Sequence, residues 1–381
     1  MSAPVYLDYN ATTPVAPEVA EAMEPFLHEA FGNPSSSHAY GQRARDAVAA
    51  ARQAVAQLIG AQPPEIVFTG CATEANNLAL LGVARALSGG KRHLMVSAVE
   101  HPAVMAPARY LAEHGWELTV VPVDRFGLVS PDDIGRALRP DTALVSIMHA
   151  NNEVGTIQPI LEIARITRER GVLLHTDAAQ SVGKIAVGVD ELGVDLLTLA
   201  GHKFYATKGI GALYVRGGTP IRPILLGADQ EHALRAGTEN VPAIVGLGMA
   251  ATLAREGLHR ATPLLRERRD WLHRALREAV PELVLNGHPE QRLPNTLHLS
   301  FPGISGRDLL ARAEGIAASV GSACHSEHDA VSGVLAAMGV DAARAAGAVR
   351  LSVGMMTTEG DIDTAARSLI TAWKSVCGAP S

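Results

Sequence analysis

Short apolar runs alternate with longer stretches of helical periodicity between about residue 65 and residue 215. Runs of this kind predict buried strands, and the stretches between them, such as 103–114 and 160–170, predict helices. Because strands joined through crossover helices pair in parallel, the alternation predicts an α/β fold with a mostly parallel, doubly wound sheet of about seven strands. The predicted strands are residues 65–69, 93–97, 117–123, 142–148, 172–175, 196–199 and 211–215.

A different pattern flanks this region. Helical composition at 17–27 and 38–59 precedes it, and a charge-rich stretch from about 250 to 280 follows, which predicts a long connecting helix with a solvated face. We therefore expect a large domain at 15–255 and a smaller α+β domain formed by 256–381 together with 1–14. The predicted elements of the smaller domain are strands 283–285, 296–300, 317–320 and 349–352, with helices 306–313 and 359–375.

Composition narrows the class of protein. Apolar residues make up 47% of the chain and charged residues 19%, as in a soluble enzyme with a large core. The net charge of −6 argues against a nucleic-acid-binding surface. No apolar run approaches the ~18 residues of a membrane span, and the first residues lack the pattern of a signal peptide. The three cysteines are odd in number and lack C-x-x-C spacing. We expect a cytoplasmic protein that binds neither nucleic acid nor membrane.

Two charged residues stand at the ends of predicted strands. Strand 196–199 leads into Gly201-His202-Lys203, and strand 172–175 leads into Asp177. Because functional groups gather outside the carboxyl ends of parallel strands, both side chains are expected to face one crevice. A buried lysine suits bond formation with an aldehyde cofactor, and a carboxylate keeps a pyridine nitrogen protonated. The pair predicts a pyridoxal phosphate site, although each residue alone is more often a surface lysine or a helix cap.

A helix N-terminus follows the first strand of the predicted sheet. Residues 65–69 run into Gly70-Cys-Ala72-Thr73, where a helical pattern begins. Free N–H groups and the positive end of the helix dipole make such a turn an anion site, to which the Thr73 hydroxyl adds a donor. On its own this is the pattern of an ordinary helix cap. Together with the lysine–aspartate pair it predicts a cup for the phosphate of the cofactor.

Polar side chains follow other strands of the same sheet. His101 comes after strand 93–97 and is suited to stack on a flat ring and to carry protons. Asn152 and Gln180 are amides suited to the phenolic oxygen of the cofactor, and Asn152 also suits a substrate carboxylate. A lone histidine before a proline is more often structural, so these assignments depend on the pair at 177 and 203.

The C-terminal part carries a candidate nucleophile. Cys324 follows a predicted strand among small residues, and His325 or His328 would lower the pKa of its thiol. A buried, inert cysteine is the commoner case. The spacing of these histidines and Glu327 does not suit zinc, so we expect no metal.

Arg350 lies in a predicted apolar strand, where a guanidinium needs a carboxylate partner. A bound substrate carboxylate would meet that need. The other two cysteines, Cys71 and Cys377, are interpreted as structural.

Taken together, the motifs resemble those of the cysteine desulfurases, a class V aminotransferase-like branch of the fold-type I pyridoxal phosphate enzymes. The resemblance covers nearly the whole chain, and it implies the fold-type I architecture. Two segments, 201–205 and 318–328, look closest to the selenocysteine lyases, a sister group. The matching segments are 6–14, 31–35, 72–74, 100–101, 151–155, 175–181, 201–203, 235–240, 321–324 and 350–354.

The resemblance implies a role for each matching residue. Lys203 would carry the cofactor covalently and move protons, and Cys324 would take sulfur from L-cysteine, leaving a persulfide and L-alanine. The other implied contacts are Asp177 to the pyridine nitrogen, Gln180 to the phenolic oxygen, His101 to the ring and to proton transfer, Ala72, Thr73 and His202 to the phosphate end together with Thr238 from the other subunit of a homodimer, and Arg350 and Asn152 to the substrate carboxylate.

Three positions depart from the family's pattern. Ala200 stands where a serine is usual, which removes a hydroxyl from the phosphate site. Gly70-Cys71 replaces the usual Ser-Gly, and Met355 replaces a frequent arginine. None of these departures touches the lysine, the aspartate or the loop cysteine.

We therefore expect a homodimeric cysteine desulfurase that passes sulfur to an acceptor protein. Three alternatives stay open. The nearest is a selenocysteine lyase that releases selenium from L-selenocysteine with the same residues. The others are a class V aminotransferase or epimerase, and a non-catalytic scaffold that binds a sulfur-carrier partner.

Overall fold

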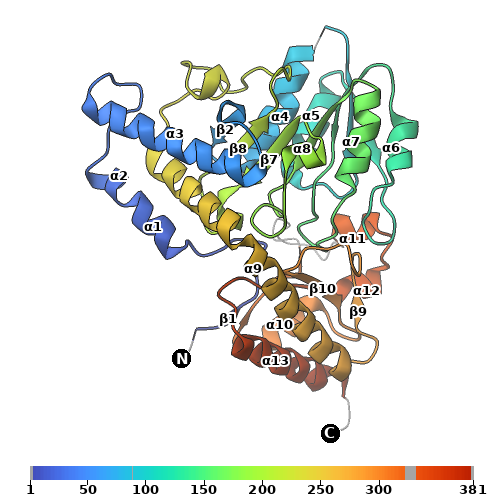
Figure 1. Ribbon diagram of the computed structural model, residues 1–381. Coiled ribbons are helices and arrows are strands. Elements are labelled where there is room, and N and C mark those ends of the chain that lie inside the picture. The colour runs from blue at the N-terminus through green and yellow to red at the C-terminus, as the bar shows by residue number, and fades with distance from the viewer. Residues whose placement is uncertain (1–2, 88, 322–331, 379–381) are drawn as a thin grey trace.

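The computed structural model describes residues 3–87, 89–321 and 332–378, and its largest feature is a seven-stranded sheet (Figure 1). The strand order is β2-β8-β7-β6-β5-β3-β4. β8 is antiparallel to both of its neighbours, and the other neighbouring strands are parallel, which confirms the predicted sheet. The strands are β2 (Ile66–Thr69), β3 (His93–Ser97), β4 (Glu117–Val121), β5 (Thr142–Ser146), β6 (Leu173–Asp177), β7 (Leu196–Ala200) and β8 (Gly211–Val215).

Some strands end at other residues than predicted, because the regular pairing with the neighbouring strand and the apolar run end at different positions. β5 ends at Ser146, although Ile147 is also buried and its N–H donates to the His175 carbonyl. β6 continues to Asp177, which pairs with Thr198 of β7. The aspartate therefore occupies the last position of a strand, and the sheet fixes the direction of its side chain.

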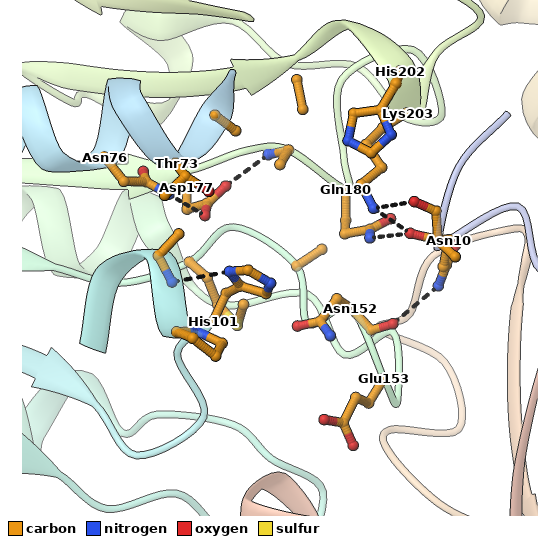
Figure 2. Close-up of a pocket in the computed structure, with 18 of the residues that line it drawn as sticks. Asn10, Thr73, Asn76, His101, Asn152, Glu153, Asp177, Gln180, His202 and Lys203 are labelled. Carbon is orange, nitrogen blue, oxygen red and sulfur yellow. Dashed lines mark hydrogen bonds between the residues drawn. The ribbon is translucent and has the colours of Figure 1, made fainter. Parts of the chain in front are cut away.

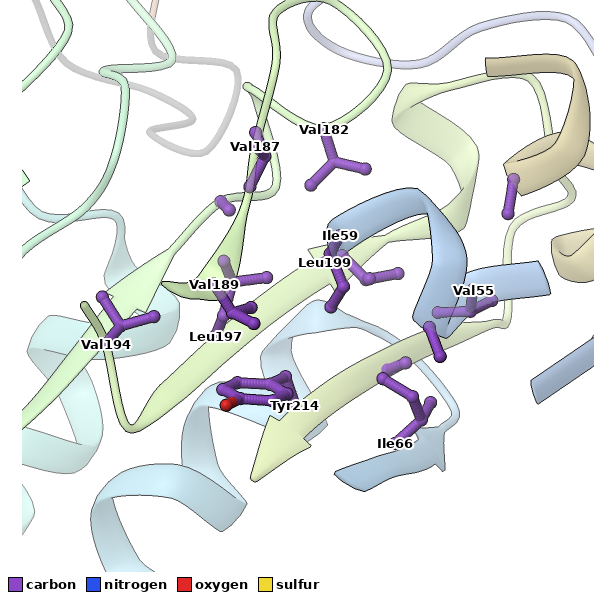
Figure 3. Packing of buried hydrophobic residues seen from close by; sticks show 14 of the residues in the cluster. Val55, Ile59, Ile66, Val182, Val187, Val189, Val194, Leu197, Leu199 and Tyr214 are labelled. Atoms are coloured by element: carbon purple, nitrogen blue, oxygen red, sulfur yellow. The ribbon is translucent and has the colours of Figure 1, made fainter. Parts of the chain in front are cut away.

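Successive residues of the strands face two helical layers, as the pleat of a strand requires. Phe68 of β2 belongs to a buried cluster with α3, α7 and α9, whereas the preceding Val67 packs with α4 and α5. Figure 3 shows Ile59 of α3 lying close to Leu197 and Leu199 of β7. The helices of the two layers are α3 (Ala39–Ile59), α4 (Ala72–Leu87), α5 (Pro102–Glu113), α6 (Pro131–Ala137), α7 (Ile160–Glu169), α8 (Val189–Leu192) and α9 (Val241–Ala279).

The helix α9 is 39 residues long and runs from the large sheet into the C-terminal part (Figure 1). The predicted start of this helix, near residue 250, is wrong. The helix begins after Asn240, whose side chain caps it by accepting the Ala243 N–H. At Gly248 a Cβ atom would lie 2.7 Å from the Cβ of Ala51, so the absence of a side chain lets α9 approach α3 closely.

An 18-residue window of α9 has a mean hydropathy of 1.2, so by length and composition alone it passes the test for a membrane span. This corrects the expectation that the chain holds no such stretch. Residues of α9 such as Leu247 and Ala251 belong to the core cluster, and 44% of the window is buried. A core helix that packs on several sides has this composition, so burial in the protein accounts for it.

The C-terminal part contains a three-stranded antiparallel sheet with β10 in the centre. The predicted strand at 317–320 is wrong, because β11 covers Ile316–Ala317 and pairs in parallel with β1 (Val5–Tyr6). The predicted helix at 17–27 divides into two short helices at Pro25. The remaining elements are α1 (Pro17–Met23), α2 (Pro25–His28), β9 (Val284–Leu285), β10 (Thr296–Ser300), α10 (Gly306–Arg312), α11 (Gly333–Ala337), α12 (Ala342–Ala346), β12 (Ala348–Ser352) and α13 (Glu359–Cys377), with 3₁₀ turns at Pro63–Glu65, Gly201–Lys203 and Glu231–Ala233.

Buried apolar residues form one cluster on each face of the large sheet and another around β10 and α13. Leu7 belongs to the cluster around β10, far along the chain from its other members. Because α9 runs unbroken through residues 255 and 256, the backbone marks no boundary there. The division into 15–255 and 256–381 plus 1–14 stays a prediction.

Candidate active site

A cavity of about 310 Å³ lies beyond the carboxyl ends of β5, β6 and β7, beside the first turn of α4. This is the edge at which open α/β sheets bind ligands. Figure 2 shows Asp177 and Asn76 on one side of the cavity and Lys203, Gln180 and Asn10 on the other. The predicted site residues that line it are Ala72, Thr73, His101, Asn152, Asp177, Gln180, His202, Lys203 and Arg350.

Lys203 ends the 3₁₀ turn that follows β7, so the sheet delivers its side chain to the cavity. The turn is tight at Gly201, where a Cβ atom would lie 2.8 Å from a side-chain carbon of Ile210. The Lys203 Nζ donates to the carbonyl oxygens of Asn10 at 2.6 Å and Ala11 at 2.7 Å. The N-terminal segment therefore holds the amine in place, a contact that strand patterns alone did not predict.

Asp177 reaches the cavity from the last position of β6. Its Oδ2 accepts from Asn76 Nδ2 at 2.7 Å, and its Oδ1 accepts from the Ala179 N–H at 2.9 Å. Asn76 is fully buried in α4 and was missed in the sequence. The available signal was an amide on the apolar face of an amphipathic helix, where a polar side chain needs a partner.

The first turn of α4 lines the cavity through Ala72 and Thr73. The Glu74 carboxylate closes the turn by accepting the Gly70 N–H at 2.8 Å, and it pairs with Arg235 at 2.8 Å. Cys71, interpreted from the sequence as structural, is exposed and lines the cavity. Its sulfur takes the position of a helix-capping group, 3.5 Å from the Glu74 nitrogen.

Two histidines line the cavity with lowered proton affinity. His101 caps α5, with its Nδ1 accepting the Ala103 N–H at 3.0 Å. Burial lowers the pKa of His101, and the nearby Lys203 lowers it further against the opposing effect of Asp177. Burial, followed by Lys203, lowers the pKa of His202 to about 4. Both imidazoles are therefore expected to be neutral at pH 7.

Gln180 joins the lysine side of the cavity to a buried network. Its Nε2 donates to the Asn10 carbonyl at 2.9 Å, the same oxygen that accepts from Lys203. Its Oε1 accepts from Lys184 Nζ at 2.8 Å. The Asn10 side chain in turn bonds to Thr296 at 2.9 Å. Asn10 thus links the site to β10, a role that its sequence pattern did not predict.

Arg350 enters the cavity from β12 of the C-terminal part. Its Nη2 pairs with Asp8 at 2.6 Å, and its Nη1 donates to the carbonyls of Asn152 at 3.0 Å and Gly321 at 3.2 Å. Its Nε is buried without a hydrogen-bond partner among the described residues. The predicted carboxylate partner thus exists within the chain, as Asp8.

We expect Arg350→Lys to raise the KM for an amino-acid substrate by about 10-fold or more, with a smaller change in kcat. An ammonium keeps the charge but loses the planar fork that holds a carboxylate. Steady-state kinetics measure this. Arg344→Lys is the matched control, since Arg344 binds Asn286 and the Leu285 carbonyl and does not line the cavity. Equal KM values for the two variants would contradict the assignment.

Two predicted site residues do not line the cavity of the described chain. Thr238 is exposed, in the loop before α9. Cys324 lies outside the described residues, so its role stays a prediction. Gly321, the last residue described before that gap, lines the cavity. Within the described ranges, no three side chains of His, Cys, Asp or Glu are grouped as metal ligands.

Three histidines behind and beside the site are almost completely buried, and burial lowers the pKa of His149 to about 4 and of His175 and His298 to about 3. Because the unfolded chain takes up protons near pH 6.5 and the folded chain does not, stability is full above that pH and falls as the pH drops toward 4. We expect a loss of about 2 kcal/mol per histidine between pH 7 and pH 5. Urea unfolding at both pH values measures it, and equal free energies would contradict it.

The chain is similar in sequence to known proteins over most of its length. The sequence profile of the family described as "Aminotransferase class-V" matches residues 5–364. The chain is 49% identical over 365 residues to a protein named cysteine desulfurase IscS from Dictyoglomus turgidum, covering 95% of this chain and 93% of that one. It is 47% identical over 361 residues to a protein of the same name from Methanosarcina thermophila, covering 94% and 89%.

Solved structures give the same result. A structure titled "NIFS-LIKE PROTEIN" superposes with a TM-score of 0.91 at 40% identity, covering 97% of this chain and 98% of that one. A structure titled "SspA in complex with cysteine" superposes with a TM-score of 0.82 at 36% identity, covering 93% and 99%. The chain therefore belongs to the class V aminotransferase family, in the branch of the proteins named cysteine desulfurase.

Proposed function

We propose that this protein is a pyridoxal phosphate-dependent cysteine desulfurase, which removes sulfur from L-cysteine and releases L-alanine. The observation that carries the proposal is the meeting of Lys203 and Asp177 in one cavity at the ends of β6 and β7. Family membership supports the same cofactor and reaction. The relatives compared above are named cysteine desulfurases, so a selenocysteine lyase is not favoured.

The donors in the cavity fit pyridoxal phosphate. The amine of Lys203 suits the aldehyde, the carboxylate of Asp177 suits the pyridine nitrogen, and the first turn of α4 suits the phosphate through its N–H groups and Thr73. Ala200 offers no hydroxyl at the phosphate end, so this site has one donor fewer than the family's pattern. When bound, the cofactor supplies an electron sink for the bonds at Cα of the substrate.

Each of the other steps, which are substrate binding, cofactor binding and proton transfer, is assigned to a side chain that lines the cavity. Lys203 would bind the cofactor and transfer the substrate's Cα proton, and neutral His101 would accept and return a proton beside it. Asp177, held by Asn76, would bind the ring nitrogen of the cofactor. Arg350 would bind the substrate carboxylate through the part of its guanidinium that lines the cavity.

Sulfur leaves the substrate by transfer to a cysteine thiolate. The Cys324 sulfur attacks the substrate sulfur, the Cβ–S bond breaks and an S–S bond forms. The electron pair of the broken bond and a proton remain with the three-carbon product, so the products are L-alanine and a Cys324 persulfide. No external oxidant or reductant is needed.

The partners follow from this chemistry and from the position of Thr238. A persulfide must be delivered, so we propose a sulfur-acceptor protein, such as one that builds iron–sulfur clusters. The exposed position of Thr238, away from its own cavity, supports a homodimer in which it serves the other subunit's phosphate site. The reducing chemistry of a free thiol fits a cytoplasmic location, without nucleic acid or membrane contact.

The test is alanine release by the purified enzyme from L-cysteine and, in parallel, from L-selenocysteine under a reductant. We expect turnover of L-cysteine with a kcat/KM at least comparable to that for L-selenocysteine. A strong preference for L-selenocysteine would assign the lyase reaction instead. A purified protein without visible cofactor absorbance after incubation with pyridoxal phosphate would favour a non-catalytic scaffold.

A further inference from the structure

Lys184 is a buried lysine close to the site, and the reaction described above does not use it. It lies in the loop between β6 and α8, with 5% of its surface exposed, and it does not line the cavity. Its Nζ donates to Gln180 Oε1 at 2.8 Å. Its carbonyl oxygen accepts from Thr262 of α9 at 2.8 Å, which anchors the loop.

Burying an amine away from water is costly, so such a group usually has a specific partner. Among the described residues Lys184 forms no ion pair with an acidic side chain, and its hydrogen bond goes to a neutral amide. Burial lowers the pKa of Lys184 well below its usual value, and the positive charges of Lys203 and Arg350 add to this. Burial of this lysine therefore costs free energy, and its hydrogen bond to Gln180 is the contact that distinguishes it from a surface lysine.

That contact decides which way the Gln180 amide faces. The two ends of a glutamine amide are nearly equal in shape, so hydrogen bonds determine its orientation. Lys184 places N–H groups on one side whether or not its amine carries a proton, which favours the amide oxygen there. The Asn10 carbonyl can only accept, which requires the amide nitrogen on the other side, at 2.9 Å. Both neighbours demand the same orientation, and Figure 2 shows Gln180 directed toward Asn10 in the cavity.

The orientation leaves one N–H of Gln180 for an acceptor in the cavity. Gln180 Nε2 carries two hydrogens, and the Asn10 carbonyl takes one. A reversed amide would instead present its oxygen to the cavity and repel a phenolic oxygen. We propose that Lys184 is a positioning residue, which holds the Gln180 amide so that the free N–H of Gln180 faces the phenolic oxygen of the cofactor. This inference rests on the proposed cofactor site.

The test is the pH midpoint of the visible absorbance of the cofactor-loaded enzyme, read without substrate. An N–H at the phenolic oxygen stabilises that oxygen as an anion, so its loss should raise the midpoint. We expect Lys184→Met, which keeps length and buries easily, to raise the midpoint by about one unit. Gln180→Met should raise it by a similar amount.

The double variant distinguishes an effect on the orientation of the Gln180 amide from an effect of the positive charge of Lys184. If Lys184 acts through Gln180, adding Lys184→Met to Gln180→Met produces no further shift. An equal shift in both backgrounds would mean that the lysine acts by its charge on Lys203 and Arg350, and would overturn the proposal. An unchanged midpoint in the single variant Lys184→Met would overturn it too.

Lys184→Gln provides a second route if the methionine variant folds poorly. It keeps a donor at the buried position, so its midpoint should lie closer to the wild-type value than that of a variant without a donor, and a full one-unit rise would contradict the proposal. Wild-type enzyme without visible absorbance would refute the proposed function itself. Normal absorbance with additive shifts would refute only the role of Lys184.

Discussion

Lys203→Ala is expected to abolish the visible absorbance of the protein and to reduce alanine release from L-cysteine by on the order of 10³-fold or more. The amine is held by the carbonyls of Asn10 and Ala11 beyond the carboxyl end of β7, and no second described amine lines the cavity. Absorbance spectra and an alanine assay measure both effects. Borohydride treatment of the wild type followed by peptide mass analysis should place the fixed cofactor on Lys203.

Lys208→Ala is the matched control for this experiment. Lys208 is exposed in the same loop, five positions further along, and does not line the cavity. Its substitution should leave the absorbance and the rate close to those of the wild type. Fixation of the cofactor at another lysine, or full turnover by Lys203→Ala, would remove the basis for the proposed function.

Cys324→Ser is expected to lower sulfur transfer by on the order of 10²-fold or more while leaving the cofactor absorbance intact. A hydroxyl at this position cannot take the substrate's sulfur as a persulfide, whereas cofactor binding depends on other residues. The measurement is alanine formation together with mass analysis for one added sulfur atom. Full turnover of a sulfur-free amino acid by Cys324→Ser would favour an aminotransferase or epimerase.

The two other cysteines make this experiment discriminating. Cys377 contacts the Pro302 carbonyl at 3.4 Å in the C-terminal part, so Cys377→Ser should change neither step. Cys71 is exposed and lines the cavity, so it is the one alternative sulfur acceptor among the described cysteines. Loss of transfer in Cys71→Ser, with transfer retained in Cys324→Ser, would reassign the persulfide to Cys71.

The position of Cys71 also bears on the phosphate end of the site. The departures at Cys71 and Ala200 both lie on the cavity wall. A thiol is a weaker hydrogen-bond donor than a hydroxyl, and alanine donates nothing. We therefore expect the first turn of α4, with Thr73, to carry more of the phosphate binding here than the family's pattern would require.

Local sequence determined the framework of this protein. Short apolar runs and helical patterns located the seven strands, because a strand covered on both faces is apolar throughout and a helix repeats its apolar positions along one face. The strand ends then located Lys203 and Asp177, since parallel strands bring their carboxyl ends to one edge. Side chains at such an edge are close together whatever the details of packing.

Tertiary structure alone decided what holds those groups in place. Asp8 pairs with Arg350 across 342 positions, and Asn76 reaches Asp177 across 101. The pairing of β1 with β11 and the burial of Lys184 against Gln180 are further cases. A polar side chain needs a partner when buried, but its own segment does not state which distant residue supplies it, because that choice depends on how the whole chain packs.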